Sequence, residues 1–370
     1  MCGITGVYSN KKISNSVLVN TIASLKHRGP DNNNFIIDND LNIAIGHTRL
    51  SILDLSSAGN QPMSSSSGRF IISYNGEIYN HLELREEIKI IKNDHKWKGS
   101  SDTETIVEAI ELWGISETIN KLRGMYAIAI VDRKKKSLYL IRDRFGEKPL
   151  YYSKINNKFC FASELQAINI LNDCQLNINR LSVSSFLSLS YIPTPNTIYE
   201  NVYKLEPGHI LETRLDENIK ISNINYWSIK NVYEKGKKLP FVGSRKNLIQ
   251  HVSNLLEDSV KKQLISDVPL GGFLSGGIDS SLIISLMQKF SSKPIKTFTV
   301  GFDDDEFDEA HQANKIAKYI GTDHNELIIN HNDLTNLVPK ISEIYDEPFG
   351  DSSQIPTFLV SQLAKKSVKV

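Results

Sequence analysis

The feature that most constrains the fold is a regular alternation of strands and helices that begins near Ser244. It opens with an amphipathic helix whose apolar face is made of Leu248, Ile249, Val252, Leu255, Leu256 and Val260, with Ser259 beside them. After this helix the pattern predicts a strand over 268–274, a glycine loop, a helix over 280–289, a strand over 295–300, a helix over 308–320 and a strand over 324–329. This βαβαβ order predicts a parallel sheet with helices on its faces.

The first half of the chain follows a less regular pattern of short strands and helices. Strands are predicted over 43–50, 70–74, 125–131, 138–141 and 159–162, and helices over 17–25, 81–91 and 103–113. Residues 171–243 are poorer in pattern and contain Pro193, Pro195 and Pro207, which is typical of a connecting region. At about 150 residues per domain, 370 residues predict two domains. We place the first over 2–205, with a connection to about 243, and the second over 244–370.

The pattern at the end of the chain predicts that the second domain is incomplete. A helix is expected over 354–366, and residues 367–370 then begin a strand at which the sequence stops. In a parallel sheet the loop after each strand carries the chemistry. We therefore expect a truncated parallel-sheet domain.

Composition excludes several classes of protein. The 43 Lys and Arg residues balance the 42 Asp and Glu residues, so no global field favours nucleic acid or a membrane surface. The longest apolar run, over 125–131, is far shorter than the roughly 18–20 residues of a membrane helix, and the N-terminus has no secretory signal pattern. Three cysteines do not make a disulfide framework, and no His-Glu-x-x-His or Cys-x-x-Cys pattern suggests zinc. We expect a soluble, cytoplasmic protein.

Cys2 is the first candidate catalytic residue. Removal of Met1 would leave its thiol beside a free α-amine, whose reference pKa of roughly 7.7–8.0 suits a general base. On this residue alone, a small buried apolar side chain is the simpler interpretation.

Three further positions each allow two interpretations. Asn75-Gly76 is a hairpin-turn signal, but a strand-end Asn with a glycine N–H can also form an oxyanion hole. Arg49 is either a surface charge or a residue whose guanidinium binds a substrate carboxylate through two hydrogen bonds. Asp102 lies in the capping-box pattern of 101–104, but it could also pair with a ligand ammonium group.

Taken together, these residues resemble a known family. The motifs are HRGPD at 27–31, GHTRLSI at 46–52, YNGEIYN at 74–80, SDTE at 101–104, DRFGEKPLYY at 143–152 and FASE at 161–164. In this order they resemble class II glutamine amidotransferases, the N-terminal-nucleophile hydrolases, in the glutamine-hydrolysing asparagine synthetase branch. The resemblance covers residues 2 to about 165 and implies a four-layer αββα sandwich.

The resemblance also implies roles for individual residues. Mature Cys2 would attack the glutamine side-chain amide, with Asn75 and the Gly76 N–H binding the oxyanion. The glutamine itself would be held by Arg49 at its α-carboxylate, with Leu50 and Ile52 beside it, and by Glu77 and Asp102 at its α-amino end.

The second constellation is the glycine loop LSGGIDSS at 274–281, between a predicted strand and a helix N-terminus. Paired glycines and a helix dipole favour an anion there. A Walker loop is excluded because Gly277 stands where its lysine should be, and a nucleophile elbow is excluded because Phe273 replaces its first glycine. A purely structural glycine turn stays open.

Residues 275–280 resemble the pyrophosphate loop of adenylating ligases, which split ATP between its α and β phosphates. The resemblance implies an ATP site made of Leu274, Ser275, Gly276, Gly277, Asp279 and Ser280, with Val300 and Gly301 along the adenine and ribose. Asp279 is a candidate ligand for the magnesium–pyrophosphate, or alternatively a helix N-cap. The acidic stretch over 303–310 is interpreted as a solvated loop, and 346–353 resembles a segment of the synthetase site.

The resemblance implies a glutamine-dependent asparagine synthetase, in which ammonia from glutamine amidates an ATP-activated aspartate and magnesium arrives with the ATP. Four alternatives stay open: amidation of a sugar or precursor carboxylate, glutamine hydrolysis alone by a truncated chain, a β-lactam-forming relative, and a non-catalytic binding module. The expected partners are glutamine, aspartate and ATP, with no nucleic acid and no membrane. The sequence leaves a homodimer open.

Overall fold

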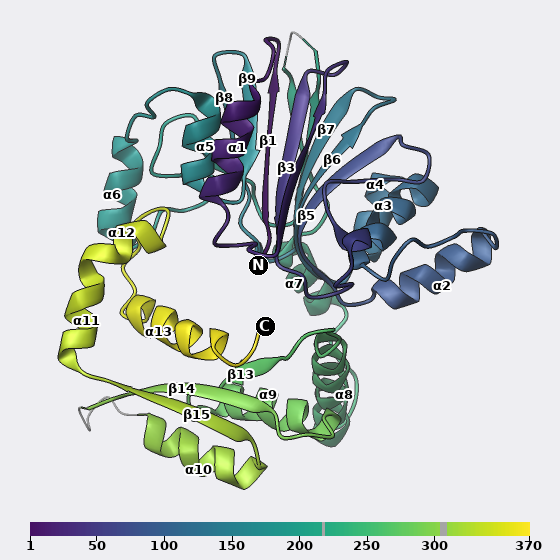
Figure 1. Cartoon of the computed structure of the whole chain (residues 1–370). Coiled ribbons are helices and arrows are strands. Elements are labelled where there is room, and N and C mark those ends of the chain that lie inside the picture. The colour runs from purple at the N-terminus through teal and green to yellow at the C-terminus, as the bar shows by residue number, and fades with distance from the viewer. Residues whose placement is uncertain (217–218, 304–308) are drawn as a thin grey trace. The chain divides into compact units, whose positions relative to one another are not determined.

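The computed structural model describes residues 1–216, 219–303 and 309–370. It forms two compact units: unit 1 comprises residues 1–238 with 346–349, and unit 2 comprises 239–345 with 350–370 (Figure 1). Within the described ranges, no helix combines the length and the apolar character needed to cross a bilayer. Most of the predicted acidic loop, residues 304–308, lies outside the described residues.

Sheet A of unit 1 places the start of the chain at its centre. Its six antiparallel strands are ordered β10-β8-β9-β1-β3-β2. Their bounds are β1 Gly3–Ser9, β2 Asn32–Asp38, β3 Ile43–Arg49, β8 Tyr151–Ile155, β9 Lys158–Ala162 and β10 Val202–Lys204. Because Gly3 of β1 is paired with Thr48 of β3, Cys2 lies next to Arg49.

Sheet B is also antiparallel, with six strands ordered β12-β11-β7-β6-β5-β4. Their bounds are β4 Met63–Ser64, β5 Phe70–Ile78, β6 Gly124–Asp132, β7 Ser137–Arg142, β11 His209–Arg214 and β12 Ile221–Asn225. β5 runs past its predicted end at 74, and Asn75 and Gly76 are paired with Ala127 and Tyr126 of β6. The hairpin-turn interpretation of Asn75-Gly76 is therefore wrong, because these residues belong to a strand.

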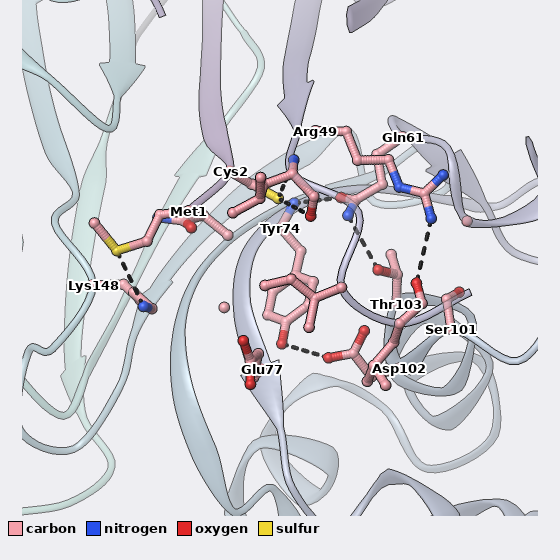
Figure 2. A pocket seen from close by; sticks show the side chains of 16 residues that line it. Met1, Cys2, Arg49, Gln61, Tyr74, Glu77, Ser101, Asp102, Thr103 and Lys148 are labelled. Carbon is pink, nitrogen blue, oxygen red and sulfur yellow. Dashed lines mark hydrogen bonds between the residues drawn. The ribbon is translucent and has the colours of Figure 1, made fainter. Parts of the chain in front are cut away.

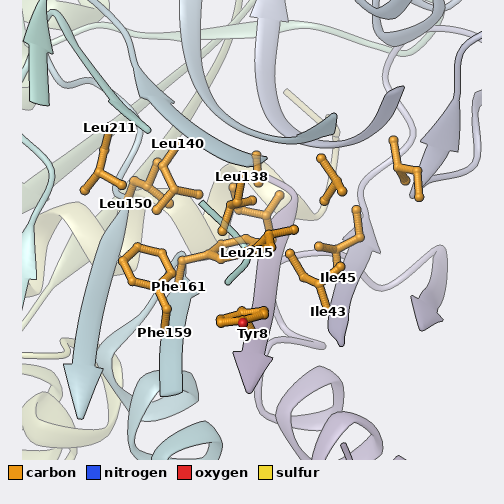
Figure 3. Close-up of a cluster of buried hydrophobic side chains, with 14 of the residues drawn as sticks. Tyr8, Ile43, Ile45, Leu138, Leu140, Leu150, Phe159, Phe161, Leu211 and Leu215 are labelled. Atoms are coloured by element: carbon orange, nitrogen blue, oxygen red, sulfur yellow. The ribbon is translucent and has the colours of Figure 1, made fainter. Parts of the chain in front are cut away.

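The two sheets pack face to face and are covered by helices on both outer sides, so the predicted αββα sandwich is confirmed. Alternate residues of the strands fill the space between the sheets, including Ile43 and Phe161 of sheet A and Leu140 of sheet B (Figure 3). On the outer face of sheet A lie α1 (Asn15–Ser24) and α5 (Leu165–Asn172). On the outer face of sheet B lie α2 (His81–Ile91), α3 (Asp102–Trp113) and α4 (Ile115–Lys121) (Figure 1).

The region predicted as a connection contains regular structure. α6 (Arg180–Leu189) lies within the first predicted domain, as does β10. Beyond residue 205, β11 and β12 extend sheet B, and α7 (Ile229–Lys238) follows.

Unit 2 contains the predicted parallel sheet. Its strands are β13 (Gly271–Phe273), β14 (Lys296–Phe302) and β15 (Asp323–Ile329), in that order. Its helices are α8 Arg245–Gln263, α9 Ile278–Phe290, α10 Ala310–Ile320, α11 His331–Leu337, α12 Ile341–Ile344 and α13 Gln354–Lys365. The βαβαβ order is therefore confirmed.

Two expectations in unit 2 need correction. β13 is shorter than predicted, and Pro269 before it has no N–H to donate to a ladder. Residues 367–370 form no strand, although Lys369 N donates to Pro269 O at 3.1 Å and Gly271 N donates to Val370 O at 2.9 Å.

Candidate active site

Cys2 lies where the backbone enters β1, and its thiol faces the residue after β3. Leu50 N donates to Cys2 Sγ at 3.4 Å, and Arg28 Nε donates to Cys2 O at 2.9 Å. Burial raises the pKa of the Cys2 thiol, although the Leu50 backbone hydrogen bond opposes this effect. These contacts fix the sulfur at the wall of a pocket.

Met1 lines the same pocket. Its Sδ lies 3.2 Å from Nζ of Lys148, a buried residue whose pKa is lowered by burial and raised in part by Glu77 (Figure 2). Burial also lowers the pKa of the Met1 α-amine to about 6. Loss of Met1 would therefore enlarge the pocket beside Cys2.

Asn75 is the most unusual polar residue of the site. It is 1% exposed, and among the described residues neither its Nδ2 nor its Oδ1 has a hydrogen-bond partner. An unpaired buried amide costs free energy, so a ligand is the natural partner for it. At Gly76, the next residue, a Cβ would lie 2.1 Å from Met125 O, so this position has no room for a side chain.

Arg49 supplies positive charge at one wall. It is 5% exposed, so the interpretation as a surface charge is wrong. Its Nη1 donates at 2.8 Å to both Ser56 O and Asn60 Oδ1, and its Nη2 donates to Leu53 O and Asp54 O. The guanidinium is thus held by residues 53–60 beside the cavity that Arg49 lines.

Two acidic residues supply the opposite charge. Asp102 Oδ2 accepts a hydrogen bond from Tyr74 Oη at 2.8 Å (Figure 2) and another from Ile78 N at 3.0 Å. Burial raises the pKa of Asp102, and burial together with the Asp102 charge raises the pKa of Glu77 to about 7. A cationic ligand beside these two carboxyl groups would lower both pKa values and so favour the ionised carboxylates.

The N-cap of α3 is Ser101, whose Oγ accepts from Glu104 N at 3.3 Å. The cap prediction therefore holds for Ser101, whereas the Asp102 side chain in the first turn bonds to Tyr74 and Ile78. Only half of the predicted capping box forms, because the Glu104 carboxylate accepts from Lys98 N and Gly99 N instead of the Ser101 backbone.

All eight residues predicted to act on glutamine line one cavity of about 50 Å³. They are Cys2, Arg49, Leu50, Ile52, Asn75, Gly76, Glu77 and Asp102. A nucleophile, an unpaired amide, a cation and two acids around one cavity match an α-amino acid that carries a side-chain amide.

The glycine loop of unit 2 lies between β13 and α9, as predicted. Leu274 is buried and its N–H donates to Phe298 O at 2.9 Å, whereas Ser275 and Gly277 are exposed. Gly276 has φ +82°, a conformation that favours glycine. Ser275 Oγ and Ser280 Oγ lie 3.1 Å apart across the loop.

Val300 and Gly301 lie near the carboxyl end of β14, which neighbours β13 in the parallel sheet. The N-cap of α9 is Gly277, so the N-cap interpretation of Asp279 is wrong, and its exposed side chain belongs to the first turn of α9. Within the described ranges, no group of three His, Cys, Asp or Glu side chains could hold a metal ion. A single carboxylate suits a magnesium ion that brings phosphate oxygens with it.

Comparisons with known proteins identify two domains in this chain. Residues 1–227 match the family model described as a glutamine amidotransferase domain, and residues 251–370 match the model described as asparagine synthase. A Methanocaldococcus jannaschii protein, named as a candidate glutamine-hydrolysing asparagine synthetase 2, is 37% identical over 100% of this chain and 73% of its own length. The chain belongs to the glutamine-hydrolysing asparagine synthetase family.

Members of this family differ in how much of their length the chain covers. Bacillus subtilis glutamine-hydrolysing asparagine synthetase 1 is 34% identical over 100% of this chain, which spans 57% of that relative. Among solved structures, B. subtilis glutamine phosphoribosylpyrophosphate amidotransferase matches 88% of this chain and 65% of its own, with TM-score 0.47 and 15% identity. That structural likeness is too low to carry an argument about function.

Several pocket residues of this family member are not predicted from the sequence. They are Leu53, Gly59, Gln61, Tyr74, Ser101, Thr103 and Lys148. Gln61 connects two walls, because its Nε2 donates to Thr103 Oγ1 at 3.1 Å and its Oε1 accepts from Tyr74 N at 2.7 Å (Figure 2). Tyr74 and Lys148 lie inside the motifs at 74–80 and 143–152, so these motifs could have indicated them. No motif contains Gln61, so nothing in the sequence indicated its role.

Proposed function

We propose that this chain hydrolyses glutamine at Cys2 and supplies the ammonia for ATP-dependent synthesis of asparagine from aspartate. The observation that carries the first part is the buried amide of Asn75, which has no hydrogen-bond partner among the described residues and lines the same cavity as Cys2. Such a group is costly unless a substrate oxygen is its intended acceptor.

The proposed reaction begins after Met1 is removed. The α-amine of Cys2 takes the thiol proton, and sulfur attacks the carbon of the glutamine side-chain amide. The Asn75 amide and the Gly76 N–H would stabilise the oxyanion. The C–N bond then breaks, the amine passes its proton to the leaving nitrogen, and ammonia departs. Water cleaves the resulting thioester to give glutamate and the free thiol.

Recognition of the amino acid would rest on opposite charges at opposite walls. Arg49 supplies the charge for the α-carboxylate, and Glu77 and Asp102 supply acceptors for the α-ammonium group. Glu77 accepts best when ionised, and its pKa of about 7 places that change near neutral pH.

We propose that unit 2 binds ATP at the loop over 274–280, with Val300 and Gly301 near the adenine and ribose. In support, the exposed loop precedes α9, a 13-residue helix whose N-terminus favours phosphate. Asp279 would ligate the magnesium of the magnesium–pyrophosphate, and ATP would activate the aspartate carboxylate by adenylation. Three free cysteines suit a reducing compartment, so we place the activity in the cytoplasm.

The test measures glutamate and asparagine in the same reaction, with glutamine, aspartate and MgATP supplied to wild type, Cys2→Ala and Asp279→Asn. We expect wild-type glutamate release to vanish in Cys2→Ala and to persist in Asp279→Asn. In a second reaction, with ammonium chloride in place of glutamine, any asparagine formed should persist in Cys2→Ala and fall in Asp279→Asn. If wild type forms glutamate but no asparagine, only glutamine hydrolysis is assigned to this chain. If wild type forms neither glutamate nor asparagine, the proposal is overturned.

A further inference from the structure

Residues 53–60 wrap around the Arg49 guanidinium. The carbonyls of Leu53, Asp54 and Ser56 and the Asn60 side chain accept its N–H groups. At Gly59 a Cβ would lie 2.0 Å from Arg49 Nη2, so only glycine leaves room for the guanidinium. The position of Arg49 therefore depends on the conformation of this loop.

Asp54 sets that conformation. Its backbone is left-handed, with φ +55°, and its side chain is buried. Asp54 Oδ1 accepts from Ser56 N at 3.1 Å and from Ser56 Oγ at 2.5 Å. Ser56 is the residue whose carbonyl accepts from Arg49 Nη1, so the Asp54 carboxylate holds Arg49 through Ser56.

The second oxygen of Asp54 reaches the other wall of the pocket. Asp54 Oδ2 accepts from Ser100 N at 2.7 Å. Ser100 is two residues before Asp102 and precedes Ser101, the N-cap of α3. At Gly99 a Cβ would lie 2.1 Å from Asp54 Oδ2, so the backbone of 99–100 must approach this carboxylate closely.

The Asp54 carboxylate is held in its ionised form. Burial would raise its pKa, but the hydrogen bonds from Ser56 and Ser100 outweigh burial and lower it. Both oxygens then act as acceptors at once, which an amide in the same place could not do.

We propose that Asp54 is a positioning residue that fixes the distance between Arg49 and Asp102, and so sets the specificity of the pocket for an α-amino acid with both charged groups. This inference rests on the proposed glutamine site. It predicts that loss of the Asp54 bridge weakens recognition of the α-carboxylate and α-ammonium groups without impairing the Cys2 sulfur.

The test compares two alkylating reagents on the full chain. A diazoketone analogue of L-glutamine carries both α-groups, whereas iodoacetamide carries neither. Two variants are used. Asp54→Asn turns an NH₂ group toward Ser56 or Ser100, and Gly99→Ala adds a methyl group that displaces the Asp54 carboxylate. The matched controls are Asp94→Asn, at an exposed aspartate of the loop that contains Gly99, and Gly236→Ala, whose Cβ meets nothing within 4 Å.

We expect both variants to be labelled about 10- to 100-fold more slowly by the diazoketone, with iodoacetamide labelling unchanged. For glutamine hydrolysis, the KM should rise by a similar factor with little change in kcat. Equal slowing by both reagents would make Asp54 merely structural, and wild-type rates in both variants would show that it has no role; either overturns the inference. If wild-type Cys2 reacts with iodoacetamide but not with the diazoketone, the proposed glutamine site itself fails.

Discussion

The two units differ in how much of their candidate site is already enclosed by protein. In unit 1 the amide of Asn75 and the carboxylate of Asp102 are buried, and hydrogen bonds from Tyr74 and Ile78 hold the carboxylate in place. In unit 2 the loop residues Ser275 and Asp279 are exposed, and Ile278 beside them is 86% exposed. Charges act more strongly away from water, so the first site is preorganised and the second relies more on its ligand.

The cores show the same contrast. Among the largest buried side chains of the described residues, only Phe298 belongs to unit 2, whereas Phe161, Tyr126 and Phe159 all belong to unit 1. Each unit also has buried clusters of its own, so we expect the two units to respond separately to mutation.

The largest difference in effect between the two units is expected for a mutation of Cys2. Cys2→Ala should lower glutamate release by at least about 10³-fold, because it removes the nucleophile, while ATP binding by unit 2 is unchanged. Cys174→Ala, a free cysteine outside the pocket, is the matched control and should behave like wild type. Substantial glutamine hydrolysis by Cys2→Ala would contradict the assignment.

Core truncations should separate the units thermodynamically. Phe161→Ala and Phe298→Ala should each cost about 3–5 kcal/mol in the unit that contains them. Calorimetry should show different transitions moving in the two variants, and only Phe161→Ala should lower the temperature at which glutamine hydrolysis is lost. If both variants shift one common transition, the units do not unfold independently.

Asn75→Ala tests preorganisation in unit 1 directly. Its kcat for glutamine should fall about 10²- to 10³-fold, since an oxyanion donor contributes roughly 2.7–4 kcal/mol. Its thermal stability should be unchanged or higher, because the amide is buried without a partner among the described residues. Asn34→Ala, an exposed position on β2, is the control. A large loss of stability in Asn75→Ala would indicate a structural role for the amide.

The smallest effect is expected from the titration of Glu77. As pH rises through about 7, Glu77 ionises and the KM for glutamine should fall; Glu77→Gln should remove that pH dependence and raise the KM about 10-fold at pH 8.

The same group predicts a stability trend of known sign. The pKa is raised above its ordinary 4.5, so the folded state binds the proton more tightly, and stability should decrease as pH rises from about 4.5 to 7. Glu77→Gln should flatten this trend by about 1–3 kcal/mol, with exposed Glu117→Gln as the control. In the binding experiment, a wild-type KM for glutamine that is constant from pH 6 to 8 would argue against a role for Glu77 in glutamine binding.

Features that depend on local sequence pattern were predictable. α2 has the predicted bounds, because its apolar residues recur at helical spacing, and the βαβαβ order of unit 2 follows from the same kind of periodicity. The chemical types of Cys2, Asn75 and Arg49, within motifs of fixed order, predicted one cavity that the structure then assembled.

Features whose partners are distant in the chain depend on the packing of the whole unit and were not predictable. β1, β8 and β11 have weak local signals and become strands by pairing with neighbours in the sheets. Asp54, Gln61 and Tyr74 became part of the site because each bonds to the start of α3 or the loop before it, from 28 to 46 residues away. A one-dimensional pattern records the type of each side chain but not which buried donor will face which acceptor, and that pairing is what fixes the charges of this site.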